Sequence, residues 1–212
     1  MLCRAIDSGD SRLLPVPFSG GPVYATIFWC TTGLWVALEN IGLLFTTGRS
    51  RRGRKSSDKG SSGVLVFFTW LGIGLDFALS FQFSQAAIRW ERTSIFFIGI
   101  ALMLAGTAFR FYAMRILGRS FTYYVAVHDK QTVVEVGPYH YIRHPSYTGA
   151  LMIFIGLGLA LGNWAGILVL LACVGIAYAY RISVEESVLA ATLGEPYQGY
   201  MRRTRRLIPF LF

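Results

Sequence analysis

Residues 147–180 read YTGALMIFIGLGLALGNWAGILVLLACVGIAYAY, two apolar runs divided by a short polar break. The break is Gly162-Asn163-Trp164, and neither run contains a charged residue. A helix that crosses a hydrocarbon core of ~30 Å needs about 20 mainly apolar residues. Because so few residues join the two runs, the sequence predicts a tight helical hairpin with antiparallel helices.

Other apolar runs precede this hairpin, and hydrophobic residues make up 54% of the chain against 15% charged residues. The sequence therefore predicts an all-α integral membrane protein with about five transmembrane helices. The expected spans are 23–45, 64–88, 94–116, 147–161, and a fifth from about 165 to beyond Tyr180. We expect three regions: 1–63 with the first span and a basic linker, 64–116 with two spans, and a core at 117–212.

The placement of Lys and Arg predicts the orientation of these spans. Six basic residues lie within 49–59, and Arg202, Arg203, Arg205 and Arg206 follow the last span. Segments on one expected side carry fourteen basic residues, whereas those on the other carry four. Since cytoplasmic loops are rich in Lys and Arg, we expect an extracytoplasmic N-terminus and a cytosolic C-terminus.

The same basic residues could suggest nucleic acid, because the formal net charge is +9. They cluster beside apolar spans without a recognition motif, which favours topology signals and contacts with anionic membrane lipids. Cys3, Cys30 and Cys173 are far apart, so we expect neither a disulfide framework nor a metal site. Residues 1–20 lack the order of a cleaved signal peptide, and the first span is expected to be retained.

A polar motif precedes the fourth span, where residues 137–149 read GPYHYIRHPSYTG. Pro145 favours the first position of a helix, so Arg143 and His144 are expected beside a helix N-terminus. Free N–H groups there attract anions, and both side chains could assist. The alternative is an ordinary turn with basic and aromatic residues at a membrane boundary.

A second polar group lies at the far end of the fifth span. Arg181 and Glu185 are four residues apart and share a helix face, whereas Glu186 is turned about 100° away. Alone, this spacing is typical of a simple intrahelical ion pair. The hairpin, however, brings both polar groups to matching depth, which favours a polar pocket between the two helices.

Together these motifs resemble the isoprenylcysteine carboxyl methyltransferase family. The resemblance rests on the 137–149 motif and on Arg181, Glu185, Glu186 and Leu189 at their spacing, and covers roughly residues 100–212. Gly194-Glu195-Pro196-Tyr197, Tyr200 and the run 205–210, RRLIPF, resemble the family's closing pattern. The resemblance implies a cytosolic cofactor pocket formed by the last helical hairpin, the preceding loop and the C-terminal helix and tail.

The resemblance also implies S-adenosyl-L-methionine as cofactor, with particular residues in contact with it. Those residues are Gln131, Thr132, Val133, Val134, Tyr139, His144, Pro145, Ser146, Tyr147 and Glu185. Arg181 corresponds to the residue that faces the acceptor carboxylate, so Arg181 and Glu185 are the expected catalytic pair. Gln131 differs from eukaryotic members, which often have His there.

Such an enzyme methylates the carboxylate of a lipophilic or prenylated acceptor. A carboxylate is already ionised at pH 7, so alignment and exclusion of water suffice without a general base. The main alternative is a phosphatidylethanolamine N-methyltransferase, although Arg181 would repel its ammonium group. A sterol-type NADPH reductase and a non-enzymatic membrane scaffold are further alternatives.

Three charged residues lie inside the expected spans, where they need partners or water. Glu39 and Arg110 share a depth near 10 Å at ~1.5 Å per residue, so we expect them to pair. Asp76 lies deeper, either facing the bundle or lining an acceptor tunnel. His128 and His140 are expected at the membrane interface. Glycines at 72, 74, 156 and 158 are expected to pack helices closely.

Overall fold

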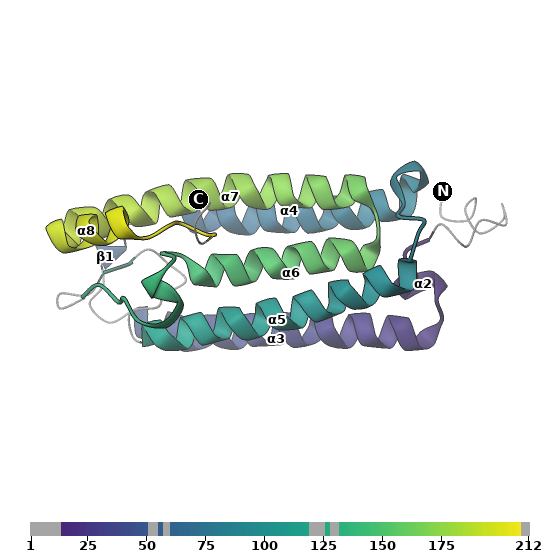
Figure 1. Cartoon of the computed structure of the whole chain (residues 1–212), viewed down its shortest axis with the longest axis horizontal. Coiled ribbons are helices and arrows are strands. Elements are labelled where there is room, and N and C mark those ends of the chain that lie inside the picture. The colour runs from purple at the N-terminus through teal and green to yellow at the C-terminus, as the bar shows by residue number, and fades with distance from the viewer. Residues whose placement is uncertain (1–13, 51–54, 57–59, 119–125, 128–131, 209–212) are drawn as a thin grey trace.

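The computed structural model describes residues 14–50, 55–56, 60–118, 126–127 and 132–208. Long helices run side by side along one axis, and the short connecting segments gather at the two ends (Figure 1). The α-helices are α2 (Val16–Ser19), α3 (Pro22–Ser50), α4 (Ser61–Gln82), α5 (Arg92–Leu117), α6 (Pro145–Leu161), α7 (Trp164–Leu193) and α8 (Glu195–Arg203). The remaining elements are the 3-10 helices η2 (Ser84–Ala86) and η4 (Gly137–His140) and the strands β1 (Lys55–Ser56) and β2 (Ala126–Val127).

The apolar helices match the expected spans, except that α4 ends at Gln82 rather than at residue 88, because η2 follows it. Four helices of the described chain are long and apolar enough to cross a membrane: α3 over Pro22–Leu44, α4, α5 and α7. Helix α6 is apolar but has 17 residues, which at 1.5 Å each make about 25 Å. Large apolar side chains such as Phe67, Trp70 and Leu168 face outward, as they do toward lipid. The chain is thus an integral membrane protein with several spans.

Glycines set the closest helix contact, which joins α5 to α6. A Cβ added at Gly99 would lie 2.6 Å from the carbonyl oxygen of Gly156, and one added at Gly106 would lie 2.6 Å from that of Gly149. Both pairs bring backbone against backbone, an approach that small residues permit between membrane helices. Helix α6 therefore packs most extensively on α5, although its hairpin partner is α7.

Of the four glycines that the sequence predicted to pack helices closely, three do so and one does not. Gly156 lies against α5, Gly72 against side chains of α7, and Gly158 against Ile167, so these three pack helices as predicted. A Cβ added at Gly74 would meet nothing within 4 Å. The prediction for Gly74 was wrong, because hydropathy does not reveal which face of α4 meets α7.

The tight hairpin between α6 and α7 is confirmed, and the two helices run antiparallel (Figure 1). Gly162 ends α6 in a left-handed conformation at φ 73°, and Asn163 caps α7 by accepting a hydrogen bond from the Gly166 N–H at 3.1 Å. The Asn163 amide also donates to the carbonyl oxygens of Leu79 and Phe83 at 3.3 and 2.9 Å. The turn is thereby fastened to the end of α4.

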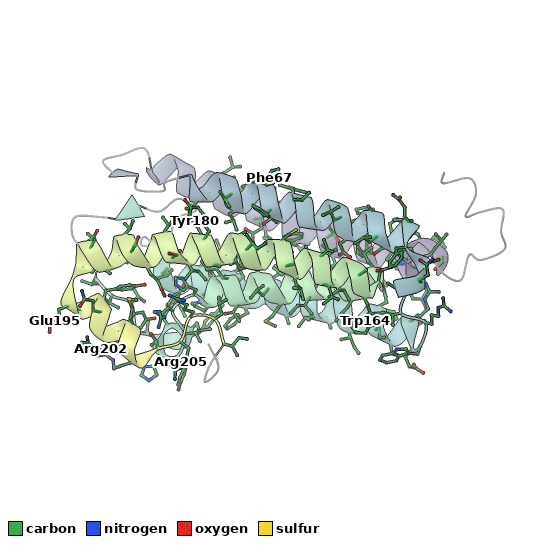
Figure 2. All side chains as sticks on the ribbon, turned by 90° about the horizontal axis from the view of Figure 1, so that it is seen from above. Phe67, Trp164, Tyr180, Glu195, Arg202 and Arg205 are labelled. Atoms are coloured by element: carbon green, nitrogen blue, oxygen red, sulfur yellow. The ribbon has the colours of Figure 1, made fainter. Side chains whose placement is uncertain are left out.

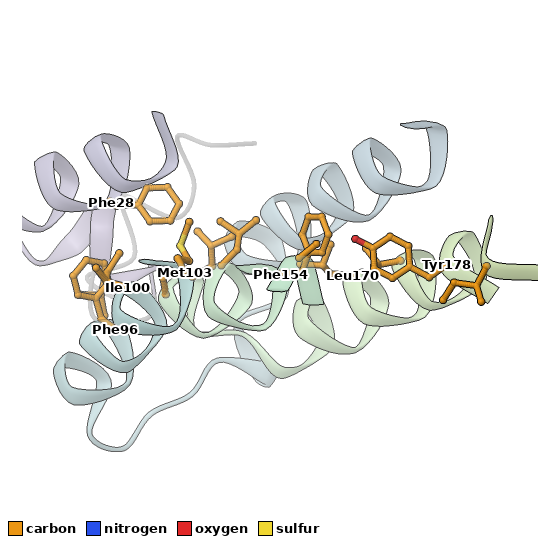
Figure 3. Packing of buried hydrophobic residues seen from close by; sticks show 14 residues of the cluster. Phe28, Phe96, Ile100, Met103, Phe154, Leu170 and Tyr178 are labelled. Carbon is orange, nitrogen blue, oxygen red and sulfur yellow. The ribbon is translucent and has the colours of Figure 1, made fainter. Parts of the chain in front are cut away.

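A continuous hydrophobic core connects the helices (Figure 3). Phe28 of α3 packs with Phe96 and Met103 of α5, and all three side chains are fully buried. Phe154 of α6 and Leu170 of α7 extend the same cluster. This core holds the ends of the helices in fixed positions relative to one another.

The segments expected on one side of the membrane lie at one end of the bundle. Strand β1 of the basic linker pairs antiparallel with β2, with Lys55 opposite Val127. Helix α8 lies at the same end (Figure 1). Arg202 and Arg205 mark that end in Figure 2, whereas Trp164 lies toward the other.

Candidate active site

Tyr139 of η4 anchors the loop that enters α6. Its phenol donates to the carbonyl oxygen of Ala113 in α5 at 3.4 Å, and its own carbonyl accepts from the Tyr200 hydroxyl of α8 at 2.7 Å. Burial raises the pKa of the Tyr139 phenol above its usual range, and the negative charge of Glu185 adds to this effect. The phenol therefore stays protonated at neutral pH.

The C-terminal tail runs alongside this loop and holds it by backbone hydrogen bonds. The N–H groups of Arg143 and His144 donate to the carbonyl oxygens of Arg205 and Arg206 at 2.7 and 3.0 Å. The Thr148 hydroxyl of α6 donates to the carbonyl oxygen of Leu207 at 2.6 Å. The tail thus passes over the first turn of α6, where Pro145 is the first helical residue.

Glu186 of α7 is the buried centre of an ionic cluster. Its carboxylate accepts hydrogen bonds from Arg143 Nε at 2.8 Å and from Arg206 Nη2 at 2.9 Å. His144 Nε2 lies 3.4 Å from the same carboxylate. One acidic residue therefore connects α7, the loop before α6 and the tail.

Arg143 also donates to the carbonyl oxygens of Met201 and Thr204, the former at 3.0 Å. Its guanidinium is thus engaged within the protein, whereas the sequence motif suggested an anion ligand. Sequence reasoning missed the role of Glu186 because its partners come from segments twenty and more than forty residues away. Its helical spacing gave no signal of them.

Glu185 and Arg181 are brought together through Tyr147 of α6. The Tyr147 hydroxyl donates to Glu185 Oε2 at 3.0 Å and accepts from Arg181 Nε at 3.3 Å. The His144 ring stacks on Tyr147, with ring centroids 5.6 Å apart, and its Nδ1 lies 4.0 Å from Glu185 Oε2. Four residues expected from the sequence therefore form one cluster across α6 and α7.

The Glu185 side chain is 31% exposed, whereas Arg181 is 2% exposed. Arg181 Nη1 donates to the hydroxyls of Ser61 and Ser62, the first residues of α4. Sequence reasoning missed both serines. Nothing local relates them to a residue about 120 positions later.

The other expected site residues lie nearby or outside the described chain. Pro145 and Ser146 are buried in the first turn of α6, and the Ser146 carbonyl oxygen accepts from Arg110 Nη1 at 2.9 Å. Irregular backbone leads to η4, and it contains Thr132, Val133 and Val134. Gln131 and His128 lie outside the described residues, and His140 is exposed.

The expected pairing of Glu39 with Arg110 is confirmed. Arg110 donates through Nε to Glu39 Oε1 and through Nη2 to Oε2, the latter at 3.1 Å. Because Arg110 also bonds to Ser146, this pair connects α3 and α5 with the start of α6. Asp76 faces the bundle, where its carboxylate is fully buried against Gly166.

The sequence of this chain is similar to those of known methyltransferases. A family model described as phospholipid methyltransferase matches residues 94–195, which run from α5 to the start of α8. A probable protein-S-isoprenylcysteine O-methyltransferase of Oryza sativa subsp. japonica is 26% identical over 144 residues, covering 66% of this chain and 75% of that protein. The protein-S-isoprenylcysteine O-methyltransferase of Schizosaccharomyces pombe is 30% identical over 114 residues. This chain is related to the protein-S-isoprenylcysteine O-methyltransferases.

The chain covers 48% of the length of the fission yeast methyltransferase and 58% of methyltransferase B of Arabidopsis thaliana. It also aligns with a solved eukaryotic intramembrane Ras methyltransferase, an isoprenylcysteine carboxyl methyltransferase, at a TM-score of 0.61 and 21% identity. That alignment covers 99% of this chain and 71% of the solved one. The membrane fold of these methyltransferases is therefore the fold of this chain.

Proposed function

We propose that this protein transfers a methyl group from S-adenosyl-L-methionine to the carboxylate of a lipophilic acceptor of the isoprenylcysteine kind. One observation carries the proposal: Tyr147 joins Glu185 to the buried Arg181 at one end of a membrane bundle. The Glu185 carboxylate reaches solvent and suits a positively charged ligand group. The buried Arg181 guanidinium suits a negatively charged one. The names of the related methyltransferases support the same reaction.

The residues around Glu185 fit the polar part of the cofactor. Its partly exposed carboxylate, with the Tyr147 hydroxyl, suits the cofactor's ammonium group. The N-terminus of α6 lacks a side-chain cap and suits the cofactor carboxylate. When bound, the cofactor supplies an electrophilic methyl group on a positively charged sulfur.

Arg181 would hold the acceptor carboxylate. A guanidinium binds a carboxylate through a planar fork, which leaves an oxygen lone pair directed at the methyl carbon. The acceptor oxygen forms the new bond to that carbon while the carbon–sulfur bond breaks and its electron pair stays on sulfur. The acceptor is ionised at neutral pH, so the contribution of the protein is alignment and exclusion of water.

Phosphatidylethanolamine is the second candidate acceptor, because the matching family model is described as phospholipid methyltransferase. Its ammonium group would have to approach Arg181 and lose a proton before attack. Arg143 and Arg206 of the same cluster are paired with Glu186, and the guanidinium of Arg181 carries the positive charge at the proposed acceptor position. Carboxyl methylation is the better match to this charge.

We also assign the cluster to the cytosolic side. The basic linker, through β1, and helix α8 lie at the same end as the cluster. Cytoplasmic loops are enriched in Lys and Arg. The cofactor would then arrive from the cytosol, and the lipid tail of the acceptor from the bilayer.

The test is methyl transfer from radiolabelled cofactor by the purified chain in lipid nanodiscs, offered N-acetylfarnesylcysteine and phosphatidylethanolamine in parallel. Carboxyl methylation predicts a farnesylcysteine product that releases labelled methanol in base. Arg181→Ala should abolish it, whereas Arg89→Ala, an exposed arginine at the opposite end of the bundle, should not. Label found only in base-stable phospholipid would replace the proposal with N-methylation. Binding of NADPH rather than S-adenosylhomocysteine would point to a reductase.

A further inference from the structure

Two serines at the start of α4 hold the guanidinium of Arg181. Arg181 Nη1 donates to Ser61 Oγ at 2.7 Å and to Ser62 Oγ at 3.1 Å. Ser61 is fully buried and Arg181 is 2% exposed, so water does not compete strongly for these bonds. The two hydroxyls therefore bind a charge that is buried at one end of the bundle.

These serines are the first two helical residues of α4, and the N-cap position before them belongs to Gly60. A serine at the N-cap itself commonly accepts a hydrogen bond from a backbone N–H of the first turn. Helix α4 instead begins after Gly60, at φ 75°, and has no side-chain cap. Both hydroxyls reach across to α7, where they accept hydrogen bonds from Arg181.

The guanidinium is held from two directions. Its Nε donates to the Tyr147 hydroxyl of α6, whereas its Nη1 donates to the serines of α4. A long arginine side chain has many rotamers, and fixing them in advance lowers the cost of binding a ligand. Helices α4 and α6 thus fix the direction in which the arginine fork points.

The two serine partners of Arg181 are neutral hydroxyls. A hydroxyl that accepts from a guanidinium keeps its own proton, which it can donate to an oxygen anion placed beside the same guanidinium. A carboxylate would then meet a positive charge and a hydroxyl donor together. This combination suits a carboxylate and opposes an ammonium group.

We propose that Ser61 and Ser62 are positioning residues that orient Arg181 for the acceptor carboxylate. The inference rests on the proposed function and adds α4 to the acceptor site. It places acceptor recognition on residues that the cofactor cluster at Glu185 does not include. Acceptor affinity and cofactor affinity should therefore respond differently to changes in these serines.

The experiment measures kcat and KM for N-acetylfarnesylcysteine, together with the Kd of S-adenosylhomocysteine, in nanodiscs. Ser61→Ala and Ser62→Ala should each raise the acceptor KM by roughly tenfold, because a hydrogen bond to a charged group is lost. The Kd of S-adenosylhomocysteine should change less than about twofold, since Glu185 and Tyr147 are retained. Ser62→Thr keeps the hydroxyl and should retain a low KM.

Ser187→Ala is the matched control, because this serine of α7 donates to the Val184 carbonyl oxygen and lies outside the Arg181 contacts given above. Wild-type transfer with unchanged acceptor KM in both alanine variants would overturn the inference and leave the proposed function standing. A parallel loss of melting temperature, cofactor binding and kcat would also overturn it, because that pattern marks a purely structural role. Absence of carboxyl methylation by the wild type would remove the proposed function and this inference together.

Discussion

The carboxylate of Glu186 accepts a hydrogen bond from Arg143 at 2.8 Å, although 43 residues separate the two in the chain. Arg206 of the tail donates to the other oxygen of the same carboxylate at 2.9 Å. Loop, helix and tail therefore meet on one acidic side chain. The loop carries His144 and leads directly into Tyr147, so this ionic cluster positions the residues proposed to bind the cofactor.

Removing the Glu186 charge should destabilise the protein strongly. Glu186→Gln leaves Arg143 buried without its anionic partner, and breaking a buried pair costs about 3–5 kcal/mol. Unfolding in detergent, followed by circular dichroism, measures the loss. Glu135→Gln is the control, because it breaks an exposed pair with Arg203. The Glu135 side chain is 42% exposed and that of Arg203 is 62% exposed, so the free energy of unfolding should change little. Equal effects of the two variants would contradict a central role for Glu186.

Glu39 and Arg110 should be strongly coupled in stability. Glu39→Gln removes the acidic partner from the buried Arg110 charge, and Arg110→Gln removes the basic partner from the Glu39 charge. Each single change should cost about 2–4 kcal/mol, whereas the double variant should cost less than the sum. A double-mutant cycle on unfolding free energies gives the coupling. Strict additivity would show that the pair contributes nothing as a pair.

The contact between α5 and α6 should not tolerate even one methyl group. In Gly99→Ala the new Cβ would meet the Gly156 carbonyl oxygen at 2.6 Å, so the backbones must separate at a cost of about 1–3 kcal/mol. Gly74→Ala is the matched control within α4, because its Cβ meets nothing within 4 Å. That variant should be neutral or slightly stabilising. Melting temperatures that rank the two variants in the opposite order would disprove the close packing.

Asp76 and Gly166 should show compensation at the other end of the bundle. A Cβ at Gly166 would overlap Asp76 Oδ1, so Gly166→Ala should destabilise the protein. Asp76→Ala removes the overlapping carboxylate, and the double variant should recover part of the loss. Recovery should be incomplete, because the Asp76 carbonyl oxygen also lies 3.1 Å from the new Cβ. Thermal unfolding of the four proteins measures the effect, and a double variant no better than Gly166→Ala would refute it.

Tyr147→Phe should reduce methyl transfer without unfolding the protein. The hydroxyl that bridges Glu185 and Arg181 is lost, while the ring still packs on His144 and Tyr178. We expect kcat/KM to fall by roughly tenfold or more, since both lost bonds involve charged groups. Labelled transfer and the melting temperature are measured on the same preparation. Unchanged kcat/KM would argue against a role for the bridge.

The sequence was sufficient for several features of this fold. Mainly apolar runs of sufficient length predicted the membrane helices, and a break of a few residues at Asn163 predicted the hairpin. Depth along a helix rises by a fixed amount per residue, so Glu39 and Arg110 were expected to pair before their helices had been placed. Each of these inferences needs only a count of residues along a helix or a turn.

Other features depended on how the helices face one another. Hydropathy did not predict that α6 packs mainly on α5, or that Gly74 lies away from α7. The spacing of Arg181 and Glu185 indicated a shared face but not that Tyr147 joins them. Rotation of a helix about its axis changes every such contact without changing the sequence pattern.

The sequence by itself determined that the chain crosses a membrane and which residues form its helices. It also determined which residues resemble a methyltransferase motif. Only the tertiary structure decided that Glu186 gathers Arg143, His144 and Arg206, and that Ser61 and Ser62 hold Arg181. The physical reason is that burial in lipid follows from local composition, whereas a buried charge is satisfied by any suitable partner that folding brings near. The partner can therefore lie anywhere in the chain, and no local sequence pattern indicates where.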